Sequence, residues 1–252
     1  MPSLDALEEA IRRLGFVNAA LLAASRALSA ASHGRCRLYR YHFVAQPIPR
    51  KPIVRAERSL TMLIRRVDHN DPLVAQFPRP AQVIEQRFRI GAQCLAAEKD
   101  GRFAGYIWLK EHEYPEDEVR CRYVLEPAGD AIWDFDVYVS PAFRLGRTFV
   151  RLWEFANTML RATGYHWSLS RISGFNPESL AAHARLAVRQ IGSATFLRLG
   201  ALQISLFDRR PWIHVGWRES HVPSLRLQGP RTGSADGGRI IASSPPRPGS
   251  SP

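Results

Sequence analysis

Two carboxylates and one histidine are the side chains best suited to acid–base chemistry. Asp134 and Asp136 alternate with apolar residues in the stretch Ala131–Val139, which predicts that both lie on one face of a strand. If that face borders a substrate cleft, either can accept a proton directly or through water. Pairing with nearby arginines is the alternative role. His183 can donate a proton near neutral pH, or it is a helix histidine without chemistry.

A turn suited to anions follows this strand. Ser140 and Pro141 break the strand, and a loop with arginine and glycine opens a predicted helix over 148–162. Helix N-termini expose unpaired N–H groups and a positive dipole end, so a diphosphate fits there. The residues assigned to this anion site are Arg144, Leu145, Gly146, Arg147 and Thr148. An ordinary strand-to-helix turn with solvated arginines is the alternative.

A second polar group lies on the predicted helix 177–186. Asn176, Ser179 and His183 are three and four residues apart, so they share one face and can line one groove. Asn176 before Pro177 is also typical of a helix N-cap followed by proline in the first turn.

The elements that must position these side chains alternate between helices and strands, which predicts a mixed α/β fold. We expect helices over residues 4–31, broken near Gly15, and over 81–90, 148–162 and 177–186. We expect strands over 37–44, 93–98, 102–110, 119–125, 131–139, 165–172, 194–199 and 202–207, with 59–67 as a strand or a short helix.

Three regions follow from this pattern. Residues 1–92 form an extension of helices and strands. This extension is either part of the same domain as the core or separate from it. Residues 93–222 form the core. Residues 228–252 are rich in Gly, Pro, Ser and Arg, which predicts a disordered tail.

The composition limits the classes of function. The chain has 252 residues and a formal charge of +12, yet only three of its 35 basic residues are lysines and the arginines are scattered. Arginine and alanine are abundant throughout, which indicates a compositional bias and argues against nucleic acid as the partner. A basic face still suits an anionic ligand or an acidic partner protein.

Cysteine usage and the apolar segments indicate a cytoplasmic protein. Three cysteines with no CxxC pair fit a reduced compartment better than a disulfide framework. The only long apolar run, Leu14–Ala31, contains Asn18 and Arg26, so we expect no membrane span. Glu111, His112 and Glu113 have no further ligand at a useful spacing, so we expect no metal site.

The turn after the strand resembles the acyl-CoA pyrophosphate loop of the GNAT acyltransferase superfamily. That loop follows the pattern V-x-P-x-[YF]-R and then R-x-x-G-x-G/A. Val139, Pro141, Phe143 and Arg144 match its start. Arg147 and Phe149 stand where the two glycines are expected, and Gly146 lies one residue early.

The second polar group resembles the family segment N-x-x-[AS]-x-x-x-Y-x-K-L-G-F. The matching residues are Asn176, Ser179, Arg185 and Leu186. His183 stands in place of the tyrosine, Ala187 of the glycine and Val188 of the phenylalanine. Together the two segments and the strands around them place the resemblance at approximately residues 93–207.

This resemblance implies a GNAT-like mixed central sheet flanked by helices, with an N-terminal helical extension. It implies transfer of an acyl group from acetyl-CoA or another acyl-CoA to an unidentified amine or hydroxyl acceptor by direct attack. No metal takes part. An acyl carrier protein as donor, or a binding module without turnover, are the alternatives. Residues 1–92 have three alternative roles: they determine acceptor specificity, form a lid, or form a homodimer contact.

The resemblance also implies roles for particular residues. Backbone N–H groups around Val137 and Val139 stabilise the oxyanion, and Asn176 and its neighbours contact the pantetheine arm. His183 takes the place of the tyrosine acid, with Tyr138 or Tyr165 as substitutes.

Overall fold

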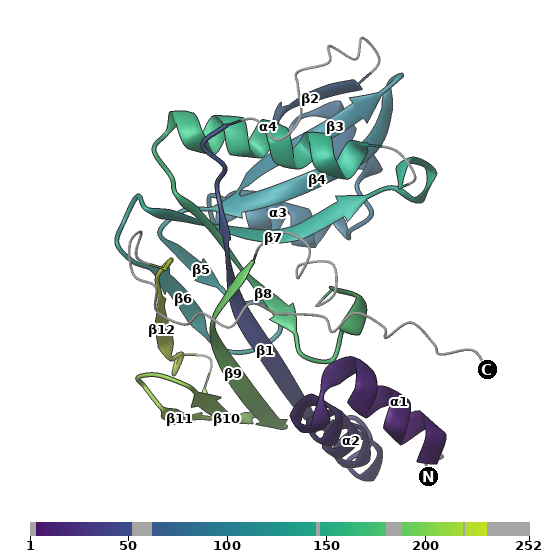
Figure 1. Cartoon of the computed structure of the whole chain (residues 1–252), viewed down its shortest axis with the longest axis vertical. Helices are drawn as coiled ribbons and strands as arrows, with labels where there is room; N and C mark the ends of the chain where they lie inside the picture. The colour runs from purple at the N-terminus through teal and green to yellow at the C-terminus, as the bar shows by residue number, and fades with distance from the viewer. Residues whose placement is uncertain (1–3, 52–61, 145–146, 180–187, 219, 231–252) are drawn as a thin grey trace, which may run out of the picture.

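A computed structural model describes residues 4–51, 62–144, 147–179, 188–218 and 220–230 (Figure 1). Its helices are α1 (Leu4–Leu14), α2 (Phe16–Ala31), α3 (Ala81–Arg89) and α4 (Thr148–Ala162), with single 3₁₀ turns at η1 (Pro72–Gln76) and η2 (Pro141–Phe143). Its strands are β1 (Cys36–Pro47), β2 (Met62–Val67), β3 (Gln93–Lys99), β4 (Arg102–Lys110), β5 (Glu113–Pro115), β6 (Arg122–Leu125), β7 (Ala131–Val139), β8 (Trp167–Ser173), β9 (Arg189–Leu199), β10 (Leu202–Phe207), β11 (Ile213–Gly216) and β12 (Ser224–Leu227).

Nine of these strands form one sheet, in the order β11-β10-β9-β1-β8-β7-β4-β3-β2. Strands β7 and β8 run parallel, and the other neighbours in this sheet are antiparallel. A smaller sheet has the order β12-β6-β5. The predicted fold class, a mixed central sheet flanked by helices, is confirmed.

The N-terminal strand β1 lies inside the large sheet, between β8 and β9. Its residues 41–45 are buried on both faces, because Tyr41 and Phe43 point to one side and Val44 to the other. Strand β2 extends the opposite end of the sheet through its pairing with β3.

The two faces of the large sheet have different covers near β7. On the face that we call the α4 face, Leu152 and Leu160 of α4 pack against Leu95 and Ile107. On the other, the α3 face, the buried Ile84 of α3 belongs to a cluster with residues of β3 and β4, among them Cys94, Ala96, Tyr106 and Trp108. The small sheet continues the cover of the α3 face, where Tyr123 and Leu225 join the same cluster as Phe43 and Trp133.

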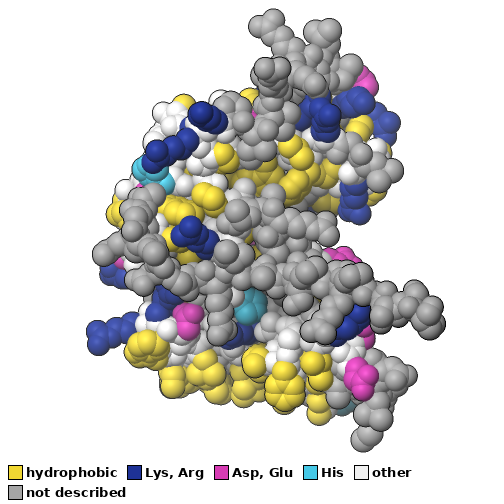
Figure 2. All heavy atoms as spheres, in the orientation of Figure 1, with side chains coloured by type: hydrophobic (Ala, Val, Ile, Leu, Met, Phe, Trp, Pro, Cys, Tyr) yellow, Lys and Arg dark blue, Asp and Glu magenta, His cyan; other side chains and the backbone are white. Residues whose placement is uncertain are grey.

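The β11 end of the large sheet exposes hydrophobic side chains. Figure 2 shows hydrophobic side chains gathered along the lower edge of the molecule, where β10 and β11 lie in Figure 1. Leu206 and Ile213 face each other across these strands, and both are exposed, as are Val215 and Trp217.

Most predicted elements are confirmed with small shifts at their ends. Helix α4 has the predicted bounds, and the first two helices meet at Gly15, whose φ of 78° suits glycine. Residues 59–67, left open as strand or helix, contain strand β2. Strands β5, β11 and β12 were not predicted. Residues 177–179 are helical, and the rest of that predicted helix lies outside the described residues, as does the predicted tail beyond residue 230.

Within the described residues, no helix is both long enough and apolar enough to cross a membrane.

The contact between α4 and the sheet predicts a large stability effect at Leu152. This side chain is fully buried, so Leu152→Ala should lower the free energy of unfolding by about 2–5 kcal/mol through lost burial and a cavity. Val150→Ala, at an exposed position of the same helix, should change it by less than about 0.5 kcal/mol. Urea unfolding followed by circular dichroism measures both values. Equal losses would contradict this packing.

Candidate functional site

Strands β7 and β8 pair over a very short stretch. Their parallel ladder joins Ala131 to Trp167, Ile132 to Ser168 and Trp133 to Leu169, and in the described structure it contains no further pair. Beyond these pairs β7 follows β4, whereas β8 follows β1 as far as Ser173. The two strands diverge in Figure 1, and we call the place where the ladder between them ends the opening.

A β-bulge lies in β7 beside this opening. The register between β4 and β7 shifts between Tyr106 and Trp108, and Asp136 has a φ of 46°, in the left-handed region. Gly105 permits the close approach of the strands here, because an added Cβ would lie 2.5 Å from the carbonyl oxygen of Tyr138.

The bulge changes which way the two aspartates point. Asp134 follows Ile132 on the α4 face and accepts a hydrogen bond from the Ser168 hydroxyl at 2.6 Å. Asp136 accepts one from the Tyr106 hydroxyl at 2.8 Å, on the α3 face. The prediction that both share one face is wrong, because the extra residue interrupts the strand's alternation.

Asp136 is held between two arginines. Arg79 donates to it from Nε at 3.0 Å and from Nη2 at 2.5 Å, and Arg87 donates from Nη1 at 2.5 Å. Arg87 also lies over the rings of Trp108 and Phe135, each centroid 5.4 Å from its guanidinium carbon. Burial raises the pKa of Asp136, but the two arginines outweigh burial and leave that pKa below its ordinary value. Of the roles left open for Asp136, these contacts favour pairing with arginine.

A second ionic group surrounds Arg171 of β8. Its Nε donates to Glu116 at 2.6 Å and its Nη2 donates to the same carboxylate at 2.7 Å. Glu118 lies 2.8 Å and Asp117 3.6 Å from Nη2. The Tyr41 hydroxyl donates to Glu118 at 2.6 Å, and the guanidinium lies 4.3 Å from the centre of the Tyr41 ring. One cation is thus shared by three carboxylates.

Burial differs sharply among these three carboxylates. The Glu116 side chain has no exposed surface, whereas those of Asp117 and Glu118 are about half exposed. Burial is the main reason that the pKa of Glu116 is raised to about 7, and Arg171 opposes the rise. Burial lowers the pKa of Arg171, but Glu116 and the other acidic groups outweigh it and raise that pKa, so Arg171 stays charged.

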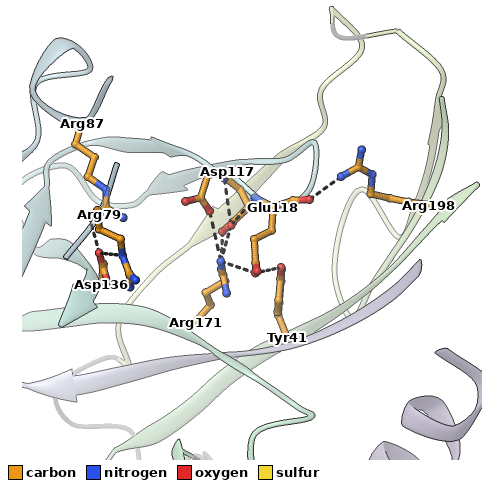
Figure 3. Close-up of polar contacts among 9 residues, drawn as sticks. Tyr41, Arg79, Arg87, Asp117, Glu118, Asp136, Arg171 and Arg198 are labelled. Atoms are coloured by element: carbon orange, nitrogen blue, oxygen red, sulfur yellow. Dashed lines mark hydrogen bonds and ion pairs between the residues drawn. The ribbon is translucent and has the colours of Figure 1, made fainter. Parts of the chain in front are cut away.

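A cavity of about 370 Å³ lies between the two ionic groups, and we call it the β7–β8 cavity. Its charged lining consists of Arg79, Arg87, Asp117, Glu118, Asp134, Asp136 and Arg171, most of which are labelled in Figure 3. Tyr114, Trp133 and Phe135 supply most of the apolar lining. The cavity therefore opens on the α3 face beside the point where β7 and β8 separate.

The residues predicted to bind the cofactor lie at the end of β7 and the start of α4. Val137 and Val139 pack into the apolar cluster beneath α4, and Arg144 donates to the carbonyl oxygen of Val139 at 3.2 Å. Arg147 precedes α4 as its N-cap and is exposed, whereas Thr148 is buried. Leu145 and Gly146 lie outside the described residues.

The second predicted segment is only partly described. The Asn176 side-chain oxygen accepts a hydrogen bond from the Ser179 backbone N–H at 3.0 Å, which is the N-cap arrangement left open above. His183 lies outside the described residues. Among those described, no group of three or more His, Cys, Asp or Glu residues is placed to hold a metal ion.

Sequence reasoning allowed for arginine pairing at Asp136 without identifying Arg79 and Arg87, and it missed the group around Arg171. The run Glu116-Asp117-Glu118 was a usable signal, because three consecutive acids are unusual in a chain of charge +12. Its partner Arg171 is 55 positions from Glu116, and Arg79 is 57 from Asp136. Residues so far apart in the sequence show no local pattern that would predict their pairing.

A larger hollow of about 1070 Å³ lies elsewhere, around Trp167 and residues 228–230. Its acidic residues have partners: Asp130 is 2.8 Å from His166, and Glu126 is 2.5 Å from Arg226. It lies at the paired beginning of β8, away from the point where β7 and β8 separate. We therefore build the candidate site on the smaller cavity.

Comparisons with known proteins give distant structural similarity. No family model matches the sequence, and no curated protein matches it significantly. A conserved protein of unknown function from Staphylococcus epidermidis is similar in structure, at 11% identity and a TM-score of 0.45 over 79% of this chain and 82% of that one. Several similar structures are GNAT-family acetyltransferases. A putative one from Novosphingobium aromaticivorans has 14% identity and a TM-score of 0.42 over 63% of each chain.

An aminoglycoside acetyltransferase from an uncultured soil sample has 11% identity and a TM-score of 0.36, over 52% of this chain and 90% of that one.

The burial of Glu116 predicts a pH-dependent stability. Because its pKa is raised from about 4.5 to about 7, the folded state favours the proton; this stabilisation is present at low pH and is lost as the pH rises through 7. From about pH 5 to pH 8, the unfolding free energy of the unmodified chain should fall by about 2–3 kcal/mol relative to Glu116→Gln. Glu85→Gln, at an exposed position of α3, serves as the control. If the unfolding free energies of the unmodified chain and of Glu116→Gln differed by the same amount at every pH, Glu116 would not titrate in this range.

Proposed function

We propose that this protein transfers an acyl group from a coenzyme A thioester to an amine that enters through the β7–β8 cavity. The observation that carries the proposal is the opening after the three-pair ladder. On its α4 side lies the turn that resembles a pyrophosphate loop, and on its α3 side lies a cavity lined with charged residues. A thioester and an acceptor can approach such an opening from opposite faces.

The donor side of the proposal uses the residues singled out in the sequence. Arg144, Leu145, Gly146, Arg147 and Thr148 bind the diphosphate, and Asn176 and Ser179 contact the pantetheine arm. Backbone N–H groups near Val137 and Val139 stabilise the oxyanion. The bulge supports this role, because a bulged residue leaves the strand ladder locally incomplete.

The reaction needs a proton acceptor for the incoming amine. Asp136 already accepts four hydrogen bonds from Arg79, Arg87 and Tyr106. Asp134 also lines the cavity, but it is 5% exposed and accepts a hydrogen bond from Ser168. We therefore assign proton acceptance to the half-exposed carboxylates of Asp117 and Glu118, and an orienting role to Asp136.

The transfer then balances as follows. An ammonium proton passes to the carboxylate, and the freed amine nitrogen bonds to the thioester carbonyl carbon. The tetrahedral intermediate collapses with cleavage of the carbon–sulfur bond. The nitrogen gives its second proton to the other of the two cavity carboxylates, and the departing thiolate takes a proton from His183. Proton exchange with solvent then restores His183 and both carboxylates, with a net release of one proton.

A second candidate keeps the reaction and changes the donor to an acyl carrier protein. Arg147 and Phe149 in place of the glycines weaken the nucleotide end of the site. Arg144 and Arg147 are exposed, and exposed arginines suit an acidic carrier.

Binding of acetyl-CoA separates these donors. Acetyl-CoA at millimolar concentration should raise the melting temperature, because it binds the folded state alone. The double variant Arg144→Ala/Arg147→Ala should weaken its binding by roughly tenfold or more, since charge-assisted hydrogen bonds are lost. Arg89→Ala, on the exposed side of α3, is the matched control. No stabilisation by acetyl-CoA, together with capture of an acyl carrier protein, would favour the second candidate.

The role of His183 has its own test. His183→Ala should slow acyl transfer by roughly 100-fold or more, the range for loss of a general acid, and should leave the dissociation constant of acetyl-CoA within about twofold. The control is His69→Ala, at an exposed loop position. Thiol release is measured with a chromogenic disulfide. Unchanged turnover would remove His183 from the mechanism, and absence of turnover in the unmodified chain with any amine would favour a binding module.

A further inference from the structure

The β7–β8 cavity has one end with excess positive charge. Arg79 and Arg87 share the carboxylate of Asp136, so this ionic group carries one more cation than anions. Asp134 also lines the cavity, but it is 5% exposed and accepts a hydrogen bond from Ser168. The Arg87 side chain is 9% exposed and the Arg79 side chain 42%, so Arg79 is the cation that a ligand can reach. Its Nε and Nη2 both donate to Asp136, and this two-point contact fixes the orientation of the guanidinium group.

The other end has excess negative charge. Arg171 is surrounded by Glu116, Asp117 and Glu118, which gives two more carboxylates than cations when all three are ionised. The accessible groups at this end are the half-exposed Asp117 and Glu118. Arg198 also touches this loop, but it donates to the backbone carbonyl of Glu118 at 3.0 Å and does not line the cavity. Figure 3 shows the two ends side by side.

The wall between the two ends is aromatic, and it contains a buried polar atom without a partner. Trp133 lines the cavity and is 1% exposed, and its indole N–H has no hydrogen-bond partner among the described residues. Buried N–H groups are normally satisfied, so a bound molecule that placed an acceptor atom here would gain one hydrogen bond.

The charge separation selects a class of ligand. A simple amine would use only the acidic end and would leave Arg79 unused, and a simple anion would be repelled by Asp117 and Glu118. A molecule with an ammonium group and a carboxylate uses both. The volume of about 370 Å³ lies near the lower end of the range for small-molecule sites, which restricts the ligand to a small molecule.

We propose that the acceptor is a free amino acid, bound with its amine at Asp117 and Glu118 and its carboxylate at Arg79. The inference rests on the proposed acyl transfer, since it names the acceptor for that reaction. The amine end adjoins β8 through Arg171, and the carboxylate end adjoins β7 through Asp136, so the ligand spans the opening between the strands. The side chain of the amino acid packs against Phe135 and Tyr114.

The test compares amino acids with amines that lack only the carboxylate. L-phenylalanine is paired with 2-phenylethylamine, and L-leucine with 3-methylbutylamine. Thiol release from acetyl-CoA gives kcat/KM, and calorimetry without acetyl-CoA gives the dissociation constant. We expect each amino acid to exceed its amine in kcat/KM by roughly tenfold or more, the worth of one charge-assisted contact.

Variants assign the preference to its residues. Arg79→Gln should raise the KM of L-phenylalanine by roughly tenfold and change that of 2-phenylethylamine by less than about twofold, with partial recovery in Arg79→Lys. Asp117→Asn/Glu118→Gln should weaken both ligands. Arg89→Gln, whose side chain is 65% exposed on α3, is the control for loss of an arginine.

The outcomes distinguish this inference from the proposed function. Equal or better use of the amines, or an Arg79→Gln variant with unchanged preference, would overturn the inference while acyl transfer stands. Absence of any thiol release would overturn the proposed function, and calorimetry would still decide whether the cavity prefers the amino acid. Failure of every amino acid to bind would overturn the inference in either case.

Discussion

The three-pair parallel ladder between β7 and β8 is the constraint from which the candidate site follows. Each strand has a second neighbour: β4 pairs with β7 from Trp133 to Val139, and β1 pairs with β8 from Trp167 to Ser173. Beyond Trp133 and Leu169 each central strand stays paired with its second neighbour, and the two central strands separate. The opening therefore follows from the strand pairing, and no loop has to move to create it. The bulge at Asp136 then turns one carboxylate of β7 toward the cavity.

Local charge at the cavity differs from the charge of the whole chain. The protein carries +12, yet the accessible groups near Arg171 are acidic. Removing an arginine from water is costly unless carboxylates and aromatic faces replace the water. Arg87 has Asp136 and two rings, and Arg171 has three carboxylates and Tyr41. The carboxylates thus fix the arginines, and the arginines fix the position of the acidic loop over β8.

Sequence patterns located the elements better than they located the site. Helix α4 and the β3–β4 hairpin were predictable because their apolar periodicity and turn residues are local signals. The bulge was not, since alternation through residues 131–139 is unbroken in the sequence and only the register with β4 reveals the extra residue. Strands β5 and β12 are three and four residues long, too short for a periodic signal. The pairs Arg171–Glu116 and Arg79–Asp136 depend on the tertiary fold alone.

The place of β1 has a consequence for how the chain acquires its structure. Arg40 of this strand bonds to Thr195 of β9, 155 positions away, and the same strand supplies the other neighbour of β8. During synthesis the first strand is made long before the two strands that enclose it. Its aromatic residues Tyr41 and Phe43 are buried in the folded protein, and they therefore stay exposed until β8 and β9 have been synthesised. Pairings between such distant segments form slowly, so the centre of the sheet is completed late, and an aggregation-prone strand stays exposed until then.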